Sequence, residues 1–143
     1  MNTNPRRNAE GYSDPTAYYA MRNIQRGENR NSRSYKPLVY ICSPFAGDVK
    51  KNTENARRFC RFAVKQNAIP FAPHLLYPQF MDDNDYDERE LGMFFAMIWL
   101  GKCDELWLFG EQLSEGMKRE FKKARLKGIP VKFFNSNCEV RTG

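Results

Sequence analysis

Two hydrophobic patterns alternate along the chain between residue 38 and residue 134. Short continuous apolar runs, typical of strands buried in a parallel sheet, occupy residues 38–42, 68–72, 103–109 and 131–134. Amphipathic stretches with helical spacing lie between them, at about residues 49–66, 88–102 and 115–127. This alternation implies right-handed crossovers and helices on both faces of a parallel sheet. The sequence therefore predicts an α/β domain, a three-layer sandwich with a sheet of four or five strands.

The helix predicted after the third apolar run carries the main candidate for chemistry. Ser114 is suited to cap its N-terminus, and Gly128 is suited to end it. Its apolar stripe consists of Leu113, Met117, Phe121 and Ala124. Glu120 falls on the edge of this stripe, above the carboxyl end of a strand, where α/β sheets usually bind ligands. Glu120 is then either a carboxylate that faces a ligand or a boundary glutamate whose head reaches water.

The second long helix, from about residue 88, is apolar around nearly its whole girth. One line of its surface holds Phe94 and Ile98, and another holds Phe95 and Trp99. A helix of this kind must be covered on more than one side. In so small a domain we expect a second copy of the chain to supply that cover, in a homodimer or higher homo-oligomer.

A long loop is predicted between the second strand and this helix. It begins with Pro73 and His74 and carries four aspartates, at 82, 83, 85 and 87. The spacing lacks the glycine and the final glutamate of an EF-hand, so it favours a solvated acidic loop over a calcium site. His74 either contacts a ligand or hydrogen-bonds to the backbone, and the basic residues after the first strand are either phosphate ligands or solvated: Lys50, Lys51, Arg57 and Arg58.

Charge and cysteine content set the cellular context. The net charge is +6, and residues 1–36 hold seven Lys or Arg against three Asp or Glu, so the basic character lies mostly in an N-terminal tail. We expect this tail to be mostly flexible, with a short helix near residues 15–25 and weak nucleic-acid contact as one hypothesis. Four cysteines without CxxC spacing and one histidine argue against zinc and favour reduced thiols. No signal peptide or membrane span is evident, so we expect a cytoplasmic protein.

Two motifs stand out: one covers the end of the first predicted strand and the turn after it, and the other opens the helix after the third predicted strand. The first is Tyr40-Ile-Cys-Ser-Pro-Phe-Ala-Gly47, and the second is Ser114-x-Gly116-x-x-x-Glu120. No GxGxxG or GxxxxGK[ST] motif accompanies them, so neither dinucleotide nor P-loop chemistry has support. In their order and spacing, the two motifs resemble the nucleoside 2-deoxyribosyltransferase-like superfamily, and one bacterial and phage branch of unknown function in particular. The resemblance covers residues 37–134.

The resemblance implies a flavodoxin-like fold and cleavage or transfer at the N-glycosidic bond of deoxynucleosides or their 5′-monophosphates. By this resemblance Glu120 would be the nucleophile that attacks C1′, and Tyr40 would contact the glutamate or the sugar. Ser114 and Gly116 match a turn that binds phosphate in the monophosphate hydrolases. The other residues that we expect at the substrate are Ser43, Pro44, Phe45, Gly47, His74, Glu90, Gly110 and Met117. No cofactor and no metal is implied.

The chain departs from the family pattern at three places. Gly110, followed by Glu111, stands where relatives that act on nucleosides often have an aspartate, and Ala46 stands where the monophosphate hydrolases have an arginine. A family aspartate near the start of the second long helix has three candidate counterparts, Asp87, Glu88 and Glu90. No general acid is therefore assigned. A second hypothesis stays open, in which the same crevice binds a nucleotide or a nucleotide-derived signal without cleaving it.

Overall fold

The computed structural model describes residues 35–142. Four parallel strands form its sheet: β1 (Leu38–Cys42), β2 (Ile69–Phe71), β3 (Glu105–Phe109) and β4 (Val131–Phe134). They lie in the order β2-β1-β3-β4, and Tyr40 at the centre pairs with Phe71 of β2 and Leu106 of β3. This is the flavodoxin-like order. Strand β2 is added on one side of β1, and β3 and β4 are added on the other side, so the switch point lies between β1 and β3. The helix expected near residues 15–25 lies outside the described residues.

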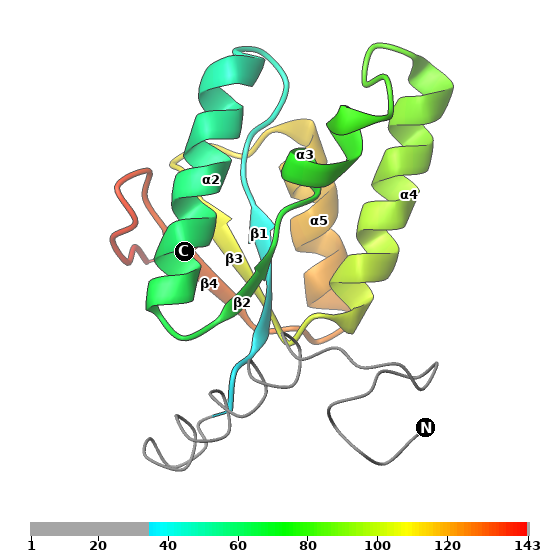
Figure 1. The fold of residues 1–143 in the computed structure, drawn as a ribbon. Coiled ribbons are helices and arrows are strands. Elements are labelled where there is room, and N and C mark those ends of the chain that lie inside the picture. The colour runs from blue at the N-terminus through cyan, green and yellow to red at the C-terminus, as the bar shows by residue number, and fades with distance from the viewer. Residues whose placement is uncertain (1–34, 143) are drawn as a thin grey trace, which may run out of the picture. The chain divides into compact units, whose positions relative to one another are not determined.

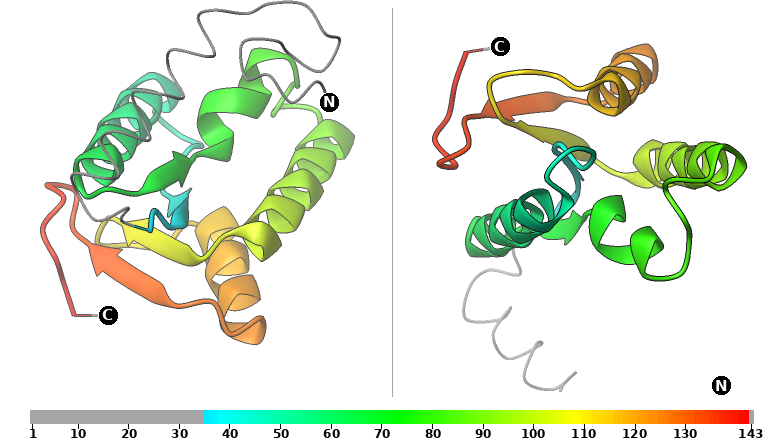
Figure 2. Two further views of the ribbon diagram at one scale, coloured as in Figure 1. Left: turned by 60° about the horizontal axis from the view of Figure 1, so that its bottom comes forward. Right: turned by 90° about the horizontal axis from the view of Figure 1, so that it is seen from above.

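Three long helices cover the two faces of the sheet (Figures 1 and 2). Helix α2 (Val49–Lys65) lies on one face, whereas α4 (Tyr86–Lys102) and α5 (Glu115–Leu126) lie on the other. The structure therefore confirms the α/β, flavodoxin-like three-layer sandwich.

Alternate side chains of β1 belong to the two hydrophobic cores on either face of the sheet. Val39 and Ile41 pack with Phe59 of α2, whereas Tyr40 and Cys42 belong to the core formed with α4 and α5. Successive side chains on a strand point to opposite faces of the sheet. Because both faces are covered, all four side chains are fully buried.

The segment expected to be a loop before α4 contains two short helices. Helix α3 spans Pro73–Leu76, and a 3₁₀ turn, η1, spans Tyr77–Gln79. Proline at the first position of α3 favours this start, because its φ is already helical and its missing N–H would have had no partner. Helix α4 then begins earlier than expected, at Tyr86, with Asp85 accepting a hydrogen bond from the Glu88 N–H as its cap.

The C-terminal segment folds back beside β4. The Arg141 N–H donates to the Phe133 carbonyl oxygen over 2.9 Å, and Val140 forms an isolated antiparallel bridge with Phe134. The described sheet thus has four strands, and the C-terminal segment adds only a single bridge to it. None of the helices within residues 35–142 is long and apolar enough to cross a membrane.

Candidate active site

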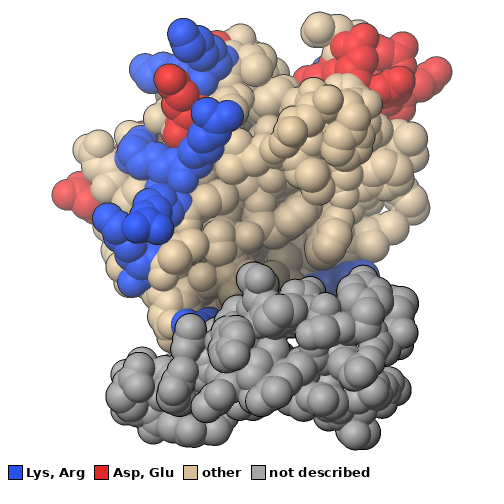
Figure 3. All heavy atoms as spheres, in the orientation of Figure 1, with Lys and Arg blue, Asp and Glu red and all other residues tan. Residues whose placement is uncertain are grey.

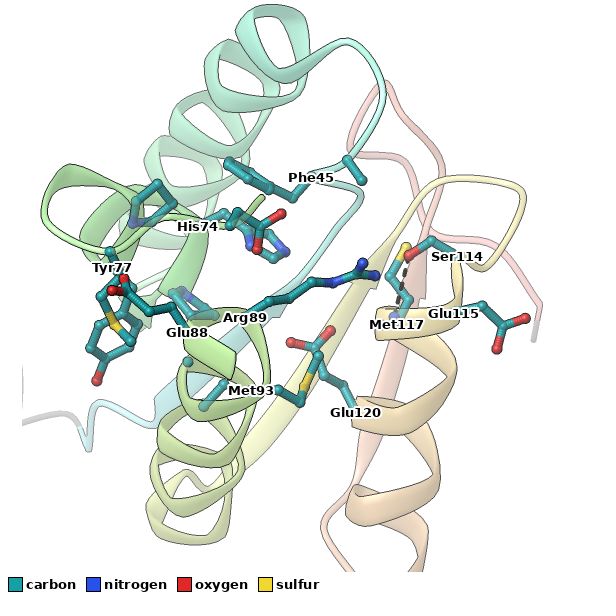
Figure 4. Close-up of a pocket in the computed structure, with 18 residues that line it drawn as sticks. Phe45, His74, Tyr77, Glu88, Arg89, Met93, Ser114, Glu115, Met117 and Glu120 are labelled. Carbon is teal, nitrogen blue, oxygen red and sulfur yellow. Dashed lines mark hydrogen bonds between the residues drawn. The ribbon is translucent and has the colours of Figure 1, made fainter. Parts of the chain in front are cut away.

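A cavity of about 330 Å³ opens at the carboxyl end of the sheet (Figure 4). Its walls come from Phe45 and Ala46 after β1, from residues within 73–83 after β2, from residues within 88–96 of α4, and from residues within 114–120 at the start of α5. The volume lies at the lower end of the ~300–1,000 Å³ usual for small-molecule sites. The position at the β1/β3 switch point is where sheets of this order bind ligands.

Glu120 is a buried carboxyl group on the wall of this cavity. It lies on α5, is 2% exposed, and has its side chain directed toward the cavity (Figure 4). The Tyr40 hydroxyl donates a hydrogen bond to its Oε2, and the Cys42 thiol donates to its Oε1 over 3.2 Å. Strand β1 thus supplies one donor to each carboxyl oxygen, because Tyr40 and Cys42 point to the same face of the sheet.

Burial controls the protonation of this group. It raises the pKa of Glu120 from its ordinary value of 4.5 to about 7, although the hydrogen bonds from Tyr40 and Cys42 and the charge of Arg119 act in the opposite direction. Burial and the nearby carboxylate raise the pKa of Tyr40 and of Cys42 well above their ordinary values. Both partners therefore stay protonated at neutral pH and act as donors, while Glu120 exists in both forms.

The burial of Glu120 corrects the view of it as an edge residue. Met117, Glu120 and Ala124 are the buried residues of α5, whereas Phe121, expected within the apolar stripe, is half-buried. The carboxyl group therefore lies at the centre of the buried face, where an unpaired polar group would be costly. The hydrogen bonds from Tyr40 and Cys42 offset part of the cost of burying this carboxyl group. The interpretation of Glu120 as a solvated boundary residue is therefore wrong.

His74 forms a second part of the cavity wall. Its ring stacks on Phe45 with the centroids 4.9 Å apart, and its Nε2 lies 3.1 Å from the carbonyl oxygen of Ser43. A carbonyl oxygen only accepts, so Nε2 carries the hydrogen. Burial lowers the pKa of His74, although the bond to Ser43 and the charge of Asp83 oppose that shift. The backbone hydrogen bond expected for His74 is present and its ring lines the cavity, while contact with a ligand stays a prediction.

A side-chain amide holds the turn that carries Phe45. The Asn52 side-chain amide donates to the carbonyl oxygens of Phe45 and Ala46 over 2.9 and 3.1 Å. Asp48 is the cap of α2, through a bond from the Lys51 N–H. The aromatic stack of Phe45 on His74 is thus fixed from both sides.

The other residues expected at the substrate divide into two groups. Those on the cavity wall, besides Phe45 and His74, are Ser114, Gly116 and Met117. Those outside the cavity wall are Ser43, Pro44, Gly47, Glu90 and Gly110.

Three of the residues outside the wall differ in their surroundings. Ser43 is buried, and its Oγ has no hydrogen-bond partner among the described residues. Glu90 forms an ion pair with Arg119 over 3.1 Å. Gly110 directly follows β3 and has φ +113°, a conformation that disfavours any residue with a side chain.

Sequence reasoning missed several wall residues on α3, η1 and α4, among them Arg89, Met93 and Tyr77. The acidic and proline-rich segment reads as a solvated loop, so it gave no sign that its residues enclose a cavity. Arg89 stands three residues after the first residue of α4, Tyr86, and its side chain extends into the cavity (Figure 4).

Fold and site define the class of this protein as a flavodoxin-like α/β domain with a buried carboxyl group at its switch point. The chain belongs to the family described as Domain of unknown function (DUF7768), whose model matches residues 37–134. No functionally curated protein matches its sequence.

Among solved structures, the chain is similar to a 2-deoxyribosyltransferase from the psychrotolerant bacterium Bacillus psychrosaccharolyticus, described as a biocatalyst for the synthesis of antiviral and antitumoral nucleosides. The two share 18% identity over 73% of this chain and 77% of the other, with a TM-score of 0.54. This likeness shows a nucleoside 2-deoxyribosyltransferase-like fold.

Proposed function

We propose that this domain is an enzyme that cleaves or transfers at the N-glycosidic bond of a nucleoside or nucleoside 5′-monophosphate, with Glu120 as nucleophile. The observation that carries the proposal is the placement of Glu120, which faces a ligand-sized cavity and is hydrogen-bonded on both oxygens. Burying a carboxyl group is costly, and a purely structural role would be met by an apolar residue. The fold shared with a 2-deoxyribosyltransferase supports this choice of chemistry.

The proposed reaction has two steps. A carboxylate oxygen of Glu120 attacks C1′, and the C1′–N bond breaks so that its electron pair leaves with the base, which takes up a proton from water. The resulting glycosyl ester then reacts with water or with a second base, which restores the carboxylate. Tyr40 and Cys42 hold the carboxyl group in one orientation during both steps, since each donates to a different oxygen.

The aromatic side of the cavity supports a base-bearing ligand. Phe45 and His74 are stacked at an interplanar angle of 21°, and Tyr77 lies on the same wall. Planar rings of this kind suit contact with a nucleobase. In this proposal the base lies near Phe45 and His74, and the sugar lies over Glu120.

Release of free base tests the proposal. The purified full chain is incubated with the common nucleosides, 2′-deoxynucleosides and their 5′-monophosphates, and free base is quantified by chromatography. We expect release from at least one member, a loss of a hundredfold or more in Glu120→Gln on the order usual for nucleophile variants, and no loss in Glu54→Gln. Glu54 is an exposed carboxylate on α2, so it controls for the same chemical change elsewhere.

Two outcomes would count against catalysis by Glu120. Base release that Glu120→Gln leaves undiminished would place the chemistry elsewhere. Tight binding of a nucleotide that is recovered intact would favour the binding-module hypothesis.

We also propose that the active form is a homo-oligomer joined through α4. Trp99 is held within the chain, stacked on Phe71 at 4.7 Å and donating to the Tyr77 hydroxyl over 2.7 Å. The other line of α4 remains open, since Phe94 is 59% and Ile98 48% exposed. Leu91, 46% exposed, continues this stripe by one turn. A two-fold interface would remove the same stripe from water in both copies.

A further inference from the structure

Arg89 differs from the other cations around the proposed active site. It is the one Lys or Arg on the cavity wall within residues 35–142. Figure 4 shows its side chain extending from the first turn of α4 across the cavity, with the guanidinium end on the side of Ser114 and Met117. Its side chain makes no hydrogen bond or ion pair among the described residues, although the arginine fork has five donors.

Neighbouring cations are already engaged or lie elsewhere. Arg119 is paired with Glu90 through both of its terminal nitrogens, and Lys118 lies 3.5 Å from Glu115. The basic residues of α2, considered above as phosphate ligands, are outside the cavity wall and gather on the surface of that helix (Figure 3). Arg58 among them donates to the Ser136 carbonyl oxygen over 2.8 Å.

Three of the four carboxylates of the wall are bonded elsewhere or point away from Arg89, and no ion pair within residues 35–142 joins Arg89 to the fourth, Asp83. Glu120 receives its hydrogen bonds from β1, and Glu88 accepts one from the Asp82 N–H over 2.8 Å. Glu115 points away from the middle of the cavity, toward solvent (Figure 4). An arginine directed into a cavity, with no carboxylate bound to it, is suited to a bidentate contact with a phosphate group.

We propose that Arg89 binds the 5′-phosphate of the substrate, so that the site takes nucleoside 5′-monophosphates in preference to nucleosides. This inference rests on the proposed function for the identity of the ligand. The cavity then has three parts with separate tasks: aromatic rings for the base, Glu120 for C1′ and Arg89 for the phosphate. The phosphate both adds affinity and fixes the sugar over the carboxyl group.

Calorimetric titration of matched ligand pairs tests the assignment. The probes are the four common 2′-deoxynucleosides and their 5′-monophosphates, titrated into the full chain carrying Glu120→Gln to slow turnover. A charge-assisted contact of this kind corresponds to about 10- to 100-fold in affinity. We therefore expect a 5′-monophosphate to bind at least about tenfold more tightly than its nucleoside, and Arg89→Gln to reduce this ratio to below about threefold.

Two further variants make the result specific. Arg89→Lys keeps the charge without the fork and should retain part of the ratio. Arg61→Gln removes an exposed arginine of α2 outside the cavity and should retain all of it. Because the Arg89 side chain is exposed and has no hydrogen bond or ion pair within residues 35–142, its replacement should leave the fold intact, which thermal unfolding checks.

The outcomes separate this inference from the proposed function. The role of Arg89 is overturned if the monophosphate and the nucleoside bind the Glu120→Gln chain about equally, or if the preference for the monophosphate survives Arg89→Gln. This holds even if base release depends on Glu120. A ratio that depends on Arg89, in a chain that releases no base from any probe, supports the phosphate site and overturns the catalytic proposal.

Discussion

The Tyr40 hydroxyl on β1 donates a hydrogen bond to the Glu120 carboxyl group on α5, across 80 positions of the chain. The contact spans the switch point of the sheet, where β1 and β3 are neighbours and the chain leaves β3 for α5. It joins the hydrophobic core to the proposed catalytic group, so one substitution at this point should alter both stability and pH dependence.

Tyr40→Phe should shift the pH dependence of activity upward. The hydrogen bond favours the charged form of Glu120 and lowers its pKa, so its loss should raise that pKa further above about 7. Since the proposed nucleophile is the carboxylate, the acidic limb of the pH–rate profile should move to higher pH. An acidic limb that stays in place, or moves down, would contradict the proposed role of this bond.

Cys42→Ala should also destabilise the charged form of Glu120, because it removes the hydrogen bond to the other carboxyl oxygen. The thiol bond to Oε1 also lowers the Glu120 pKa, but a thiol is a weaker donor than a phenol. We expect an upward shift of the acidic limb that is smaller than that of Tyr40→Phe, with Cys42→Ser closer to the parent. Equal profiles for the alanine variant and the parent would show that the thiol has no effect on Glu120.

Glu120→Gln should change stability with pH in a defined direction. The folded pKa of about 7 exceeds the ordinary value of 4.5, so the folded state holds the extra proton between these values and stability falls as pH rises through this window. The neutral amide of the glutamine does not titrate, so it avoids this loss of unfolding free energy, which is about 3 kcal/mol for a pKa raised from 4.5 to about 7. The free energy of unfolding of Glu120→Gln minus that of the parent, measured in urea, should therefore be larger at pH 8 than at pH 5. A difference in the free energy of unfolding that is the same at pH 5 and pH 8 would refute the raised pKa of Glu120.

Phe94→Glu and Ile98→Glu test the proposed interface on α4. Each places a charge on the exposed apolar stripe, whereas Lys123→Glu places one on α5 outside that stripe. We expect light scattering to show an oligomer for the parent and for Lys123→Glu, and a folded monomer for the two α4 variants. A parent that runs as a 16.8 kDa monomer at micromolar concentration would exclude the interface.

The strands and long helices could be predicted because their burial imposes a periodic pattern on the sequence. Each of the four apolar runs became a strand, and Ser114 became the cap of α5 through its bond from the Met117 N–H. Glu120 was found because a carboxylate stood near an apolar stripe. Its position at the centre of the buried face was not foreseen, since that depends on Tyr40 and Cys42 lying opposite.

The remaining wall of the cavity left little trace in the sequence. Residues 73–79 form two short helices with no hydrophobic period, and the place of residues within 73–83 at the cavity is set by tertiary contacts. Arg89 looks like any charged residue of a first helical turn, because its task follows from the direction of one long side chain. Glu90 and Gly110, expected at the substrate from their chain position, lie outside the cavity wall, and Glu90 is paired with Arg119.

The most direct test of the central claim is capture of the glycosyl–enzyme. A 2′-fluorinated 2′-deoxynucleoside and its 5′-monophosphate are incubated with the full chain, because the fluorine slows breakdown of such an intermediate, and the protein is analysed by intact mass and peptide mapping. The account predicts added mass equal to one fluorinated sugar, with or without phosphate, on the peptide that contains Glu120, and none in Glu120→Gln. Base release without any adduct, or an adduct on another residue, would contradict it.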